Sequence, residues 1–288
     1  WDWNGTLMDD VDFTHSCLNW MLETHGYPQR YDLAAYREIF GFPIEEYYIR
    51  AGFNFAKHPY AELAERFMER YNAGVDACPP SAHAAETLAE LSRRGWRQSV
   101  LSASRRDYLI EQVAARGLQG YFTELLGLAD IYGVSKVQVG KQWLAQSGIA
   151  PAACVMVGDT QHDAEVAKAL GTKCVLYTGG HQSRARLEAV CPNVIDDLAQ
   201  LPQLQLAILE NGARYVKPDG ILQYSTCTIL KEENENVAKA FLQKHPEFVP
   251  EPVYPELGGA LAQPMVTILP EMFGSDGFFV AKFRRKHS

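Results

Sequence analysis

An alternation of short apolar runs with amphipathic segments, from Ser81 to Thr178, constrains the fold of this chain more than any other feature. The periodicity predicts strands over 96–102, 123–128, 153–157 and 173–178, and helices over 81–95, 105–117, 136–148 and 163–171. Nearly continuous apolar strands separated by helices are typical of a parallel sheet that is covered on both faces. We therefore predict a doubly wound α/β core, whose functional groups gather beyond the carboxyl ends of the strands.

The segments on either side of this alternation have different patterns. Residues 11–75 carry apolar positions at helical spacing and are punctuated by Gly41, Pro43 and Pro59, which indicates a helical insertion. After about residue 201 the sequence predicts helices over 204–215 and 232–245, and strands over 221–227, 265–269 and 277–283. The predicted domains are a core from residues 1–10 and 76–201, a helical cap from 11–75 and a small α+β segment from 205–288.

Composition excludes several classes of protein. The 288 residues are 47% hydrophobic and 22% charged, with a net charge of -8, which argues against general electrostatic binding to nucleic acid or to an anionic membrane. No apolar run is long enough to span a bilayer, and there is no signal-peptide pattern. The six cysteines lack CxxC spacing, so we expect reduced thiols in a cytoplasmic protein. The sequence leaves the oligomeric state open.

Four polar residues stand where a parallel sheet would bring them together. Asp2, Ser102 and Asp159 follow apolar runs, or the place where such a run belongs, and Lys136 begins a helix. A carboxylate nucleophile, a second carboxylate for magnesium, a hydroxyl and a lysine are the groups needed for phosphoryl transfer through an aspartyl phosphate. Taken singly, each also fits a structural role, such as a strand-end hydroxyl or a solvated lysine; their joint occurrence favours the catalytic interpretation.

These residues stand in ordered motifs. They are Asp2-Trp3-Asn4-Gly5-Thr6, then Ser102 after Ser99-Val100-Leu101, then Lys136, and then Gly158-Asp159 with Asp163. From about Trp1 to Leu201 the chain resembles the haloacid dehalogenase superfamily, and the helical insertion after the first motif resembles the cap of its phosphoglycolate phosphatase-like branch. The resemblance implies a Rossmann-like core and a phosphatase that acts on a small phosphorylated metabolite.

The resemblance also assigns roles to individual residues. Asp2 would be the nucleophile, and magnesium would be held by Asp2, the backbone carbonyl of Asn4 and Asp159, with Asp163 in support. Ser102 would bind the transferring phosphate. Oxygen ligands of this kind suit magnesium.

A lysine would bind the phosphate beside Ser102. Lys136 is the better match for this role and Lys141 the weaker one. By contrast, Asp9 and Asp10 are interpreted as helix-start charges, and His162 and His181 as polar loop residues.

The first motif departs from the family pattern at position 4. The superfamily's phosphatases mostly have Asp there, which protonates the leaving group and then activates water. Asn4 does not titrate, so we expect turnover to be slower by about 10²–10⁴-fold. A non-catalytic module that binds phosphorylated ligands is a third interpretation of the chain.

The start of the chain is the second departure. Asp2 should end the central strand, yet Trp1 alone precedes it, whereas a strand needs about five residues. We expect that the parent protein has the missing residues.

A second constellation lies in the C-terminal segment. Cys227 ends a predicted strand in Tyr224-Ser225-Thr226-Cys227-Thr228, where a thiol can serve as a nucleophile if its pKa is lowered. With its flanking motifs, the segment from about residue 205 to 288 resembles the C-terminal end of the Sun/Nop-type rRNA cytosine-5 methyltransferases. That resemblance implies S-adenosylmethionine as methyl donor, RNA as partner and Cys227 as the residue that attacks cytosine.

We expect no methyltransferase activity from this chain alone. It contains no glycine-rich cofactor loop, no Asp-Ala-Pro-Cys-like motif and no markedly basic surface in the segment. Three origins for the joined halves are a true fusion, a trans-complementing fragment and a chimeric gene. The linker-free seam near residues 201–205 favours the chimeric gene.

Overall fold

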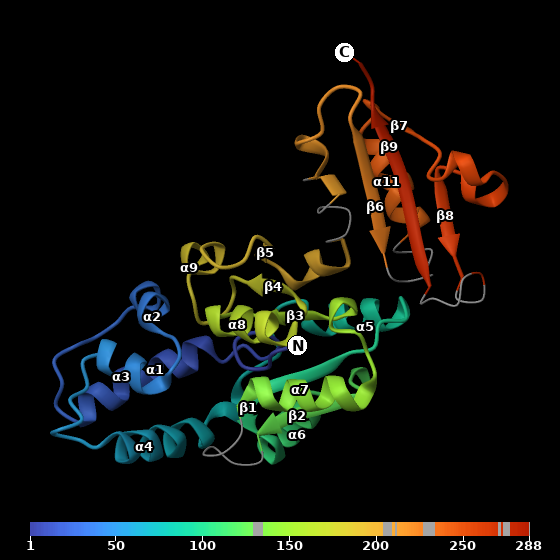
Figure 1. Cartoon of the computed structure of the whole chain (residues 1–288). Helices are drawn as coiled ribbons and strands as arrows, with labels where there is room; N and C mark the ends of the chain where they lie inside the picture. The colour runs from blue at the N-terminus through green and yellow to red at the C-terminus, as the bar shows by residue number, and fades with distance from the viewer. Residues whose placement is uncertain are drawn as a thin grey trace. The chain divides into compact units, whose positions relative to one another are not determined.

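The computed structural model describes residues 1–128, 135–203, 209–210, 212–226, 234–269, 272 and 277–287. The chain forms two compact units, one from Trp1–Ser92 with Trp96–Gln200 and one from Leu201–Ser288 with Arg93–Gly95 (Figure 1). No helix in the described ranges is both long and apolar enough to cross a membrane. None of the five cysteines that the structure describes forms a disulfide bond.

Short parallel strands form the core of the first unit. They are β1 (Ser99–Arg105), β2 (Glu124–Leu128), β3 (Val155–Gly158), β4 (Lys173–Tyr177) and β5 (Val194–Ile195). β1 pairs with β2, and β3, β4 and β5 form a second parallel ladder in that order. The predicted α/β class with parallel strands is confirmed.

The first two residues join these two ladders. The amide of Leu101 donates to the carbonyl of Trp1 at 2.7 Å, and the amide of Asp2 donates to the carbonyl of Val157 at 2.7 Å. Trp1 and Asp2 therefore lie between β1 and β3, where the central strand of the predicted sheet belongs. This hydrogen bonding is what holds Asp2 at the carboxyl ends of the strands.

Helices alternate with these strands. They are α5 (Ala84–Arg93), α6 (Arg106–Ala115), α7 (Lys136–Ser147), α8 (Gln161–Leu170) and α9 (Arg184–Glu188). β1 begins three residues later than predicted, because the amide of Trp96 still closes the preceding turn onto Leu91. Ser102 lies within β1 rather than at its end, because β1 continues to Arg105. Neither α9 nor β5 was predicted, since five and two residues are too short for a periodic signal.

Four helices follow the first motif, as the sequence predicted. They are α1 (Val11–Thr24), α2 (Leu33–Ile39), α3 (Ile44–Arg50) and α4 (Tyr60–Asn72). Their shared core is rich in aromatic side chains, among them Tyr36, Tyr47 and Tyr48. The loop after α2 carries Phe40 and Phe42, which reach the site described below.

The second unit has its own core. Its elements are β6 (Ile221–Thr226), α11 (Glu235–Lys244), β7 (Phe248–Pro250), β8 (Met265–Ile268) and β9 (Phe278–Arg285). β9 pairs antiparallel with β6, β7 and β8. Because strand side chains alternate between faces, Phe279, Ala281 and Phe283 point to one face and pack in a core with Phe241 of α11. The short strand β7 was not predicted.

Candidate active site

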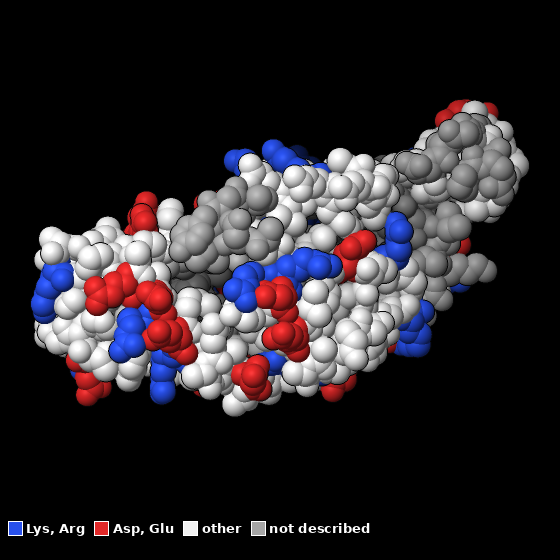
Figure 2. Space-filling view, turned by 90° about the horizontal axis from the view of Figure 1, so that it is seen from below, with Lys and Arg blue, Asp and Glu red and all other residues white. Residues whose placement is uncertain are grey.

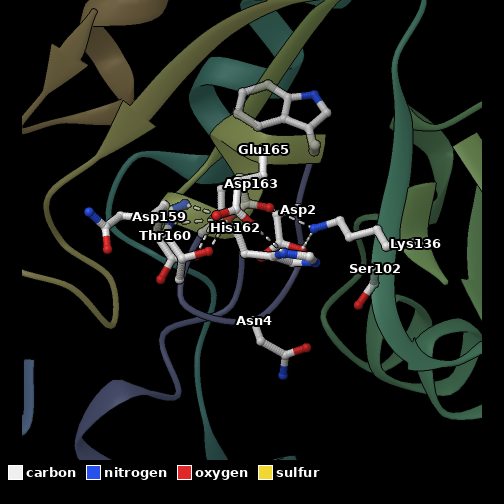
Figure 3. A network of polar contacts seen from close by, with 12 residues as sticks. Asp2, Asn4, Ser102, Lys136, Asp159, Thr160, His162, Asp163 and Glu165 are labelled. Atoms are coloured by element: carbon white, nitrogen blue, oxygen red, sulfur yellow. Dashed lines mark hydrogen bonds and ion pairs between the residues drawn. The ribbon is translucent and has the colours of Figure 1, made fainter. Parts of the chain in front are cut away.

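Three carboxylates and one lysine meet in the first unit. Oxygen atoms of Asp2, Asp159 and Asp163 all lie within 4.8 Å of one another, and all three residues are buried. Lys136 reaches from α7 toward two of them, with its Nζ 2.6 Å from Oδ1 of Asp2 and 2.7 Å from Oδ1 of Asp163 (Figure 3). Asp2 and Lys136 are thus brought to the neighbouring pair Asp159 and Asp163, although they lie far from each other and from that pair in the sequence.

Local structure aims each of these side chains. Asp159 directly follows β3, and Lys136 is the first residue of α7, whose N-terminus is closed by a capping box between Ser135 and Gln138. Asp163 stands in the first turn of α8 and accepts from the backbone amide and the hydroxyl of Thr160, which is the N-cap residue. Asp163 is the third helical residue and completes a capping box with Thr160.

Glycines make room for the carboxylates. A Cβ at Gly5 would lie 2.4 Å from Oδ2 of Asp159, and one at Gly180 would lie 2.2 Å from the same oxygen. A Cβ at Gly158 would lie 2.3 Å from Cγ of Asp163, and Gly5 also has a φ of +70°, which side-chain-bearing residues rarely adopt. The backbone is therefore shaped around the two acidic side chains.

Both oxygens of Asp159 are held in place. Thr6 donates its hydroxyl to Oδ1 at 2.9 Å, and the amide of His181 donates to Oδ2 at 2.7 Å. Outer hydrogen bonds of this kind fix the orientation of metal ligands. All three candidate ligands in the cluster are carboxylates, so their oxygen atoms suit a hard cation such as Mg²⁺.

Burial and neighbouring charges shift the pKa values of the cluster. Burial, together with the charges of Asp2 and Asp163, raises the pKa of Asp159 to about 7 against the opposing effect of His181. Burial also raises the pKa of Asp2. For Lys136, burial lowers the pKa, but Asp163 and Asp2 outweigh it and keep the ammonium charged. The cluster holds more negative than positive groups, as expected of a site that receives a cation.

Asn4 is held by the protein itself. Its Nδ2 donates to Oδ2 of Asp10 at 3.1 Å and to the hydroxyl of Tyr71 at 2.7 Å, while its Oδ1 accepts from the hydroxyl of Ser104 at 2.8 Å. Both N–H groups of the amide are thus engaged. The side chain lines the cavity beside Asp2 but offers it no titratable proton.

Asp10 stands at a helix start, as interpreted from the sequence, because it is the N-cap residue of α1. It is nevertheless only 1% exposed, makes no side-chain cap and accepts from the amide of Gly5 at 2.8 Å. His181, interpreted as a polar loop residue, is 4% exposed and places Nε2 3.3 Å from Asp10 and Nδ1 2.8 Å from the hydroxyl of Tyr36. Burial raises the pKa of Asp10, but His181 and the hydrogen bonds outweigh it, so the carboxyl stays ionised.

This second network links four segments, namely the loop after the first motif, α2 through Tyr36, α4 through Tyr71, and the loop after β4. No local signal in the sequence predicts it.

A cavity of about 80 Å³ opens onto the carboxylates. Its described lining includes all the residues predicted for the phosphatase site, namely Asp2, Asn4, Ser102, Lys136, Asp159 and Asp163. The hydroxyl of Ser102, 1% exposed, accepts from the amide of Ser104 at 3.0 Å, which leaves its proton available to a ligand oxygen. The cavity has room for several water-sized groups.

Cys227, the predicted nucleophile of the second unit, lies outside the described residues. β6 ends at Thr226, directly before it. On the part of the face that Figure 2 shows and the structure describes, basic and acidic side chains are interspersed, so no continuous basic surface appears there.

Comparison with known families separates the chain into two parts. Residues 1–177 match the model of the haloacid dehalogenase-like hydrolases, and residues 184–284 match that of the 16S rRNA methyltransferase RsmB/F. The second match begins inside the first compact unit, at the start of α9. The family boundary and the structural boundary after Gln200 therefore differ.

Individual proteins show the same division. A haloacid dehalogenase-like protein from Streptococcus pneumoniae has a TM-score of 0.62 at 18% identity, covering 70% of this chain and 95% of its own. A predicted phosphoglycolate phosphatase from Haemophilus somnus has a TM-score of 0.57 at 18% identity, covering 70% and 95%. The ribosomal RNA small subunit methyltransferase B of Thermus thermophilus is 44% identical over 93 residues, which are 32% of this chain and 23% of that protein. The chain spans from about a quarter to about half the length of the curated relatives that it matches.

Proposed function

The chain belongs to the haloacid dehalogenase-like hydrolases, and from that premise we propose that its first unit is a magnesium-dependent phosphomonoester phosphatase. The observation that carries the proposal is the convergence of Asp2, Asp159 and Asp163 with Lys136 in one buried cluster at the bottom of a cavity. Magnesium, held by Asp2, the carbonyl of Asn4 and Asp159, would supply charge screening for the transferring phosphoryl group.

The residues of the site have separate roles in the proposed reaction. An oxygen of Asp2 attacks phosphorus, so that the bond between phosphorus and the leaving oxygen breaks and an aspartyl phosphate forms. Lys136 and Ser102 hold the phosphoryl oxygens. Water then attacks the aspartyl phosphate, which releases inorganic phosphate and restores the carboxylate of Asp2.

Asp163 positions its neighbours. It holds Lys136 with one oxygen, and with the other it accepts from the amides of Asp159 and Thr160. It therefore supports both the phosphate-binding lysine and the metal-binding carboxylate.

Hydrolysis of 4-nitrophenyl phosphate tests the function directly. Activity should require Mg²⁺ and disappear when EDTA removes it. Absence of any hydrolysis in saturating Mg²⁺, for this ester and for small alkyl phosphates, would contradict the proposal.

Magnesium should also stabilise the fold, and more so at higher pH. The folded-state pKa of Asp159, about 7, lies above its ordinary 3.8, so the metal-free protein binds the proton more tightly when folded and loses stability as pH rises from about 4 to 7. The cation offsets that loss. At about a hundred times its Kd, it should add about 2.7 kcal/mol, which raises Tm by roughly 5–10 °C.

Thermal denaturation with Mg²⁺ and with EDTA measures the effect. The difference in Tm should be larger above about pH 7 than near pH 5. Asp159→Asn should remove most of it, whereas the same change at the exposed Asp76 should not. An equal shift in Asp159→Asn would show that the cation binds elsewhere.

Restoring a carboxylate at position 4 should increase turnover of alkyl phosphates. In Asn4→Asp the new carboxylate would face Asp10 and share a proton with it, since like charges at this distance do not both ionise. General acid–base catalysis of this kind contributes about 10²–10⁴-fold to kcat. Steady-state kinetics on an alkyl phosphate measures it, and the Tm should fall because Asp10 loses a donor.

An unchanged rate in folded Asn4→Asp would count against the acid–base role of position 4. If wild-type protein and this variant both bound phosphate analogues without hydrolysing any ester, a binding module would be the better description.

The similarity of residues 184–284 to the 16S rRNA methyltransferase RsmB/F supports one alternative, methylation of RNA cytosine through Cys227. It requires S-adenosylmethionine. A calorimetric titration of the chain with this cofactor that releases no heat of binding would remove the alternative.

A further inference from the structure

Four aromatic rings from the described residues line the cavity, and the partly exposed ring of Phe42 lies at its mouth. Phe40 and Phe42 come from the loop after α2, and His162 and His181 come from the core. The ring of Phe40 stacks on His181 with centroids 4.6 Å apart, and the ring of Phe42 lies 4.7 Å from that of His162. Phe42 is 38% exposed, so part of its ring is free to contact a ligand.

The lysine and the two histidines that line the cavity already contact carboxylates of the protein. Among the described lining residues, Lys136 is the one lysine or arginine, and it is paired with Asp2 and Asp163. His162 faces Glu165 at 3.3 Å, and His181 faces Asp10 at 3.3 Å.

The phosphate itself would use the proposed Mg²⁺ and Lys136, so a second anionic group on the ligand would meet no further lysine or arginine among the described lining residues. Like-charge juxtaposition without a compensating cation is a common means of rejecting a wrong ligand. A carboxylated phosphate ester such as phosphoglycolate is disfavoured on this ground. An uncharged flat group, in contrast, can stack on the exposed part of Phe42.

The hydrogen bonding of Asn4 also favours an aromatic leaving group. Its amide has no titratable proton, and both N–H groups are used by Asp10 and Tyr71. A leaving group that departs readily without a proton donor therefore suits the site. A phenol has a pKa of about 10, well below the value of about 15.7 for water, so a phenolate departs far more easily than an alkoxide.

We propose that the substrate is a phosphate monoester of a phenol that carries no second anionic group, and that Phe42 selects it by stacking on the ring. This inference rests on the proposed phosphatase function. In the reaction, the bond from phosphorus to the phenolic oxygen breaks as the bond to Asp2 forms, and the phenolate takes its proton from water.

Binding of non-hydrolysable analogues tests the selection without requiring turnover. Calorimetry in saturating Mg²⁺ would compare phenylphosphonate with phosphonoacetate, which has a carboxylate in place of the ring. We expect phenylphosphonate to bind about tenfold more tightly. Equal binding of the two, tighter binding of phosphonoacetate, or binding of neither would overturn the proposal.

Substitutions at Phe42 test whether this residue selects the aromatic ligand. Phe42→Ala should weaken binding of phenylphosphonate by roughly three- to tenfold and leave binding of methylphosphonate unchanged. Phe42→Arg should shift the preference toward phosphonoacetate. Ile49→Ala, at an exposed apolar position on α3 that does not line the cavity, is the matched control. If Ile49→Ala weakened phenylphosphonate as much as Phe42→Ala, the assignment of Phe42 would be wrong.

The phosphatase function and the substrate class can be overturned separately. Preferential binding of phenylphosphonate without hydrolysis of any ester would overturn the phosphatase function and the substrate with it, but not the aromatic selectivity of the mouth. Hydrolysis that prefers phosphoglycolate over phenyl phosphate would overturn the substrate class and leave the phosphatase function standing.

Discussion

Replacement of Asp2 by Asn should lower kcat for phenyl phosphate by about 10⁴-fold or more, which is the scale seen when a nucleophile is removed. The amide has nearly the shape of the carboxylate, but its oxygen is a poor nucleophile and no aspartyl phosphate can form. Lys136 keeps its ion pair with Asp163, so we expect the variant to fold.

Two measurements identify the cause of this loss. Steady-state kinetics should show it in Asp2→Asn and not in Asp12→Asn, which makes the same change at an exposed position of α1. Rapid acid quenching of turnover with a phosphate ester, followed by mass spectrometry, should place the transferred phosphoryl group on the peptide that contains Asp2 in the wild-type chain. Residual activity within about tenfold of wild type in a folded Asp2→Asn variant would exclude Asp2 as the nucleophile.

Replacement of Lys136 by Met should have the largest effect on stability. Lys136 is 5% exposed, and its ammonium is shared by two buried carboxylates. Removing one partner of a buried ion pair costs about 3–5 kcal/mol, because the remaining charge is left without compensation. The metal-free protein should therefore lose roughly 6–20 °C in Tm, and phosphate binding should weaken as well.

Lys141→Met is the matched control, because Lys141 lies on the same helix but is exposed. It also decides between the two lysines that the sequence offered. Thermal denaturation in EDTA measures the loss, and the double change Lys136→Met with Asp163→Asn should recover part of it by removing one uncompensated carboxylate. Equal stability of the Lys136 and Lys141 variants would contradict a buried ion pair.

Much of the fold follows from local patterns. The alternation from Ser81 to Thr178 predicted the parallel α/β class, and the helical spacing of residues 11–75 predicted α1 to α4. The ordered motifs predicted resemblance to both families, which the family matches confirm. These features are readable because periodicity and short motifs lie within a few turns or strands of the chain.

Elements too short to show a period were missed, namely α9, β5 and β7. The predicted start of β1 was also three residues too early, because the turn that ends α5 extends to Trp96. Such boundaries depend on hydrogen bonds between segments rather than on residue type.

The sequence by itself determined which groups enter the cleft: Asp2, Ser102, Lys136 and Asp159 follow one another along successive strands and helices, and the topology of a parallel sheet gathers them at one edge. The tertiary structure alone decided that the amide of Asn4 is fully engaged, that Asp10 is buried against His181, and that Phe42 lies at the mouth. The reason is that these contacts join segments up to 171 residues apart, and their formation depends on how the helical insertion packs on the core, which no local pattern encodes.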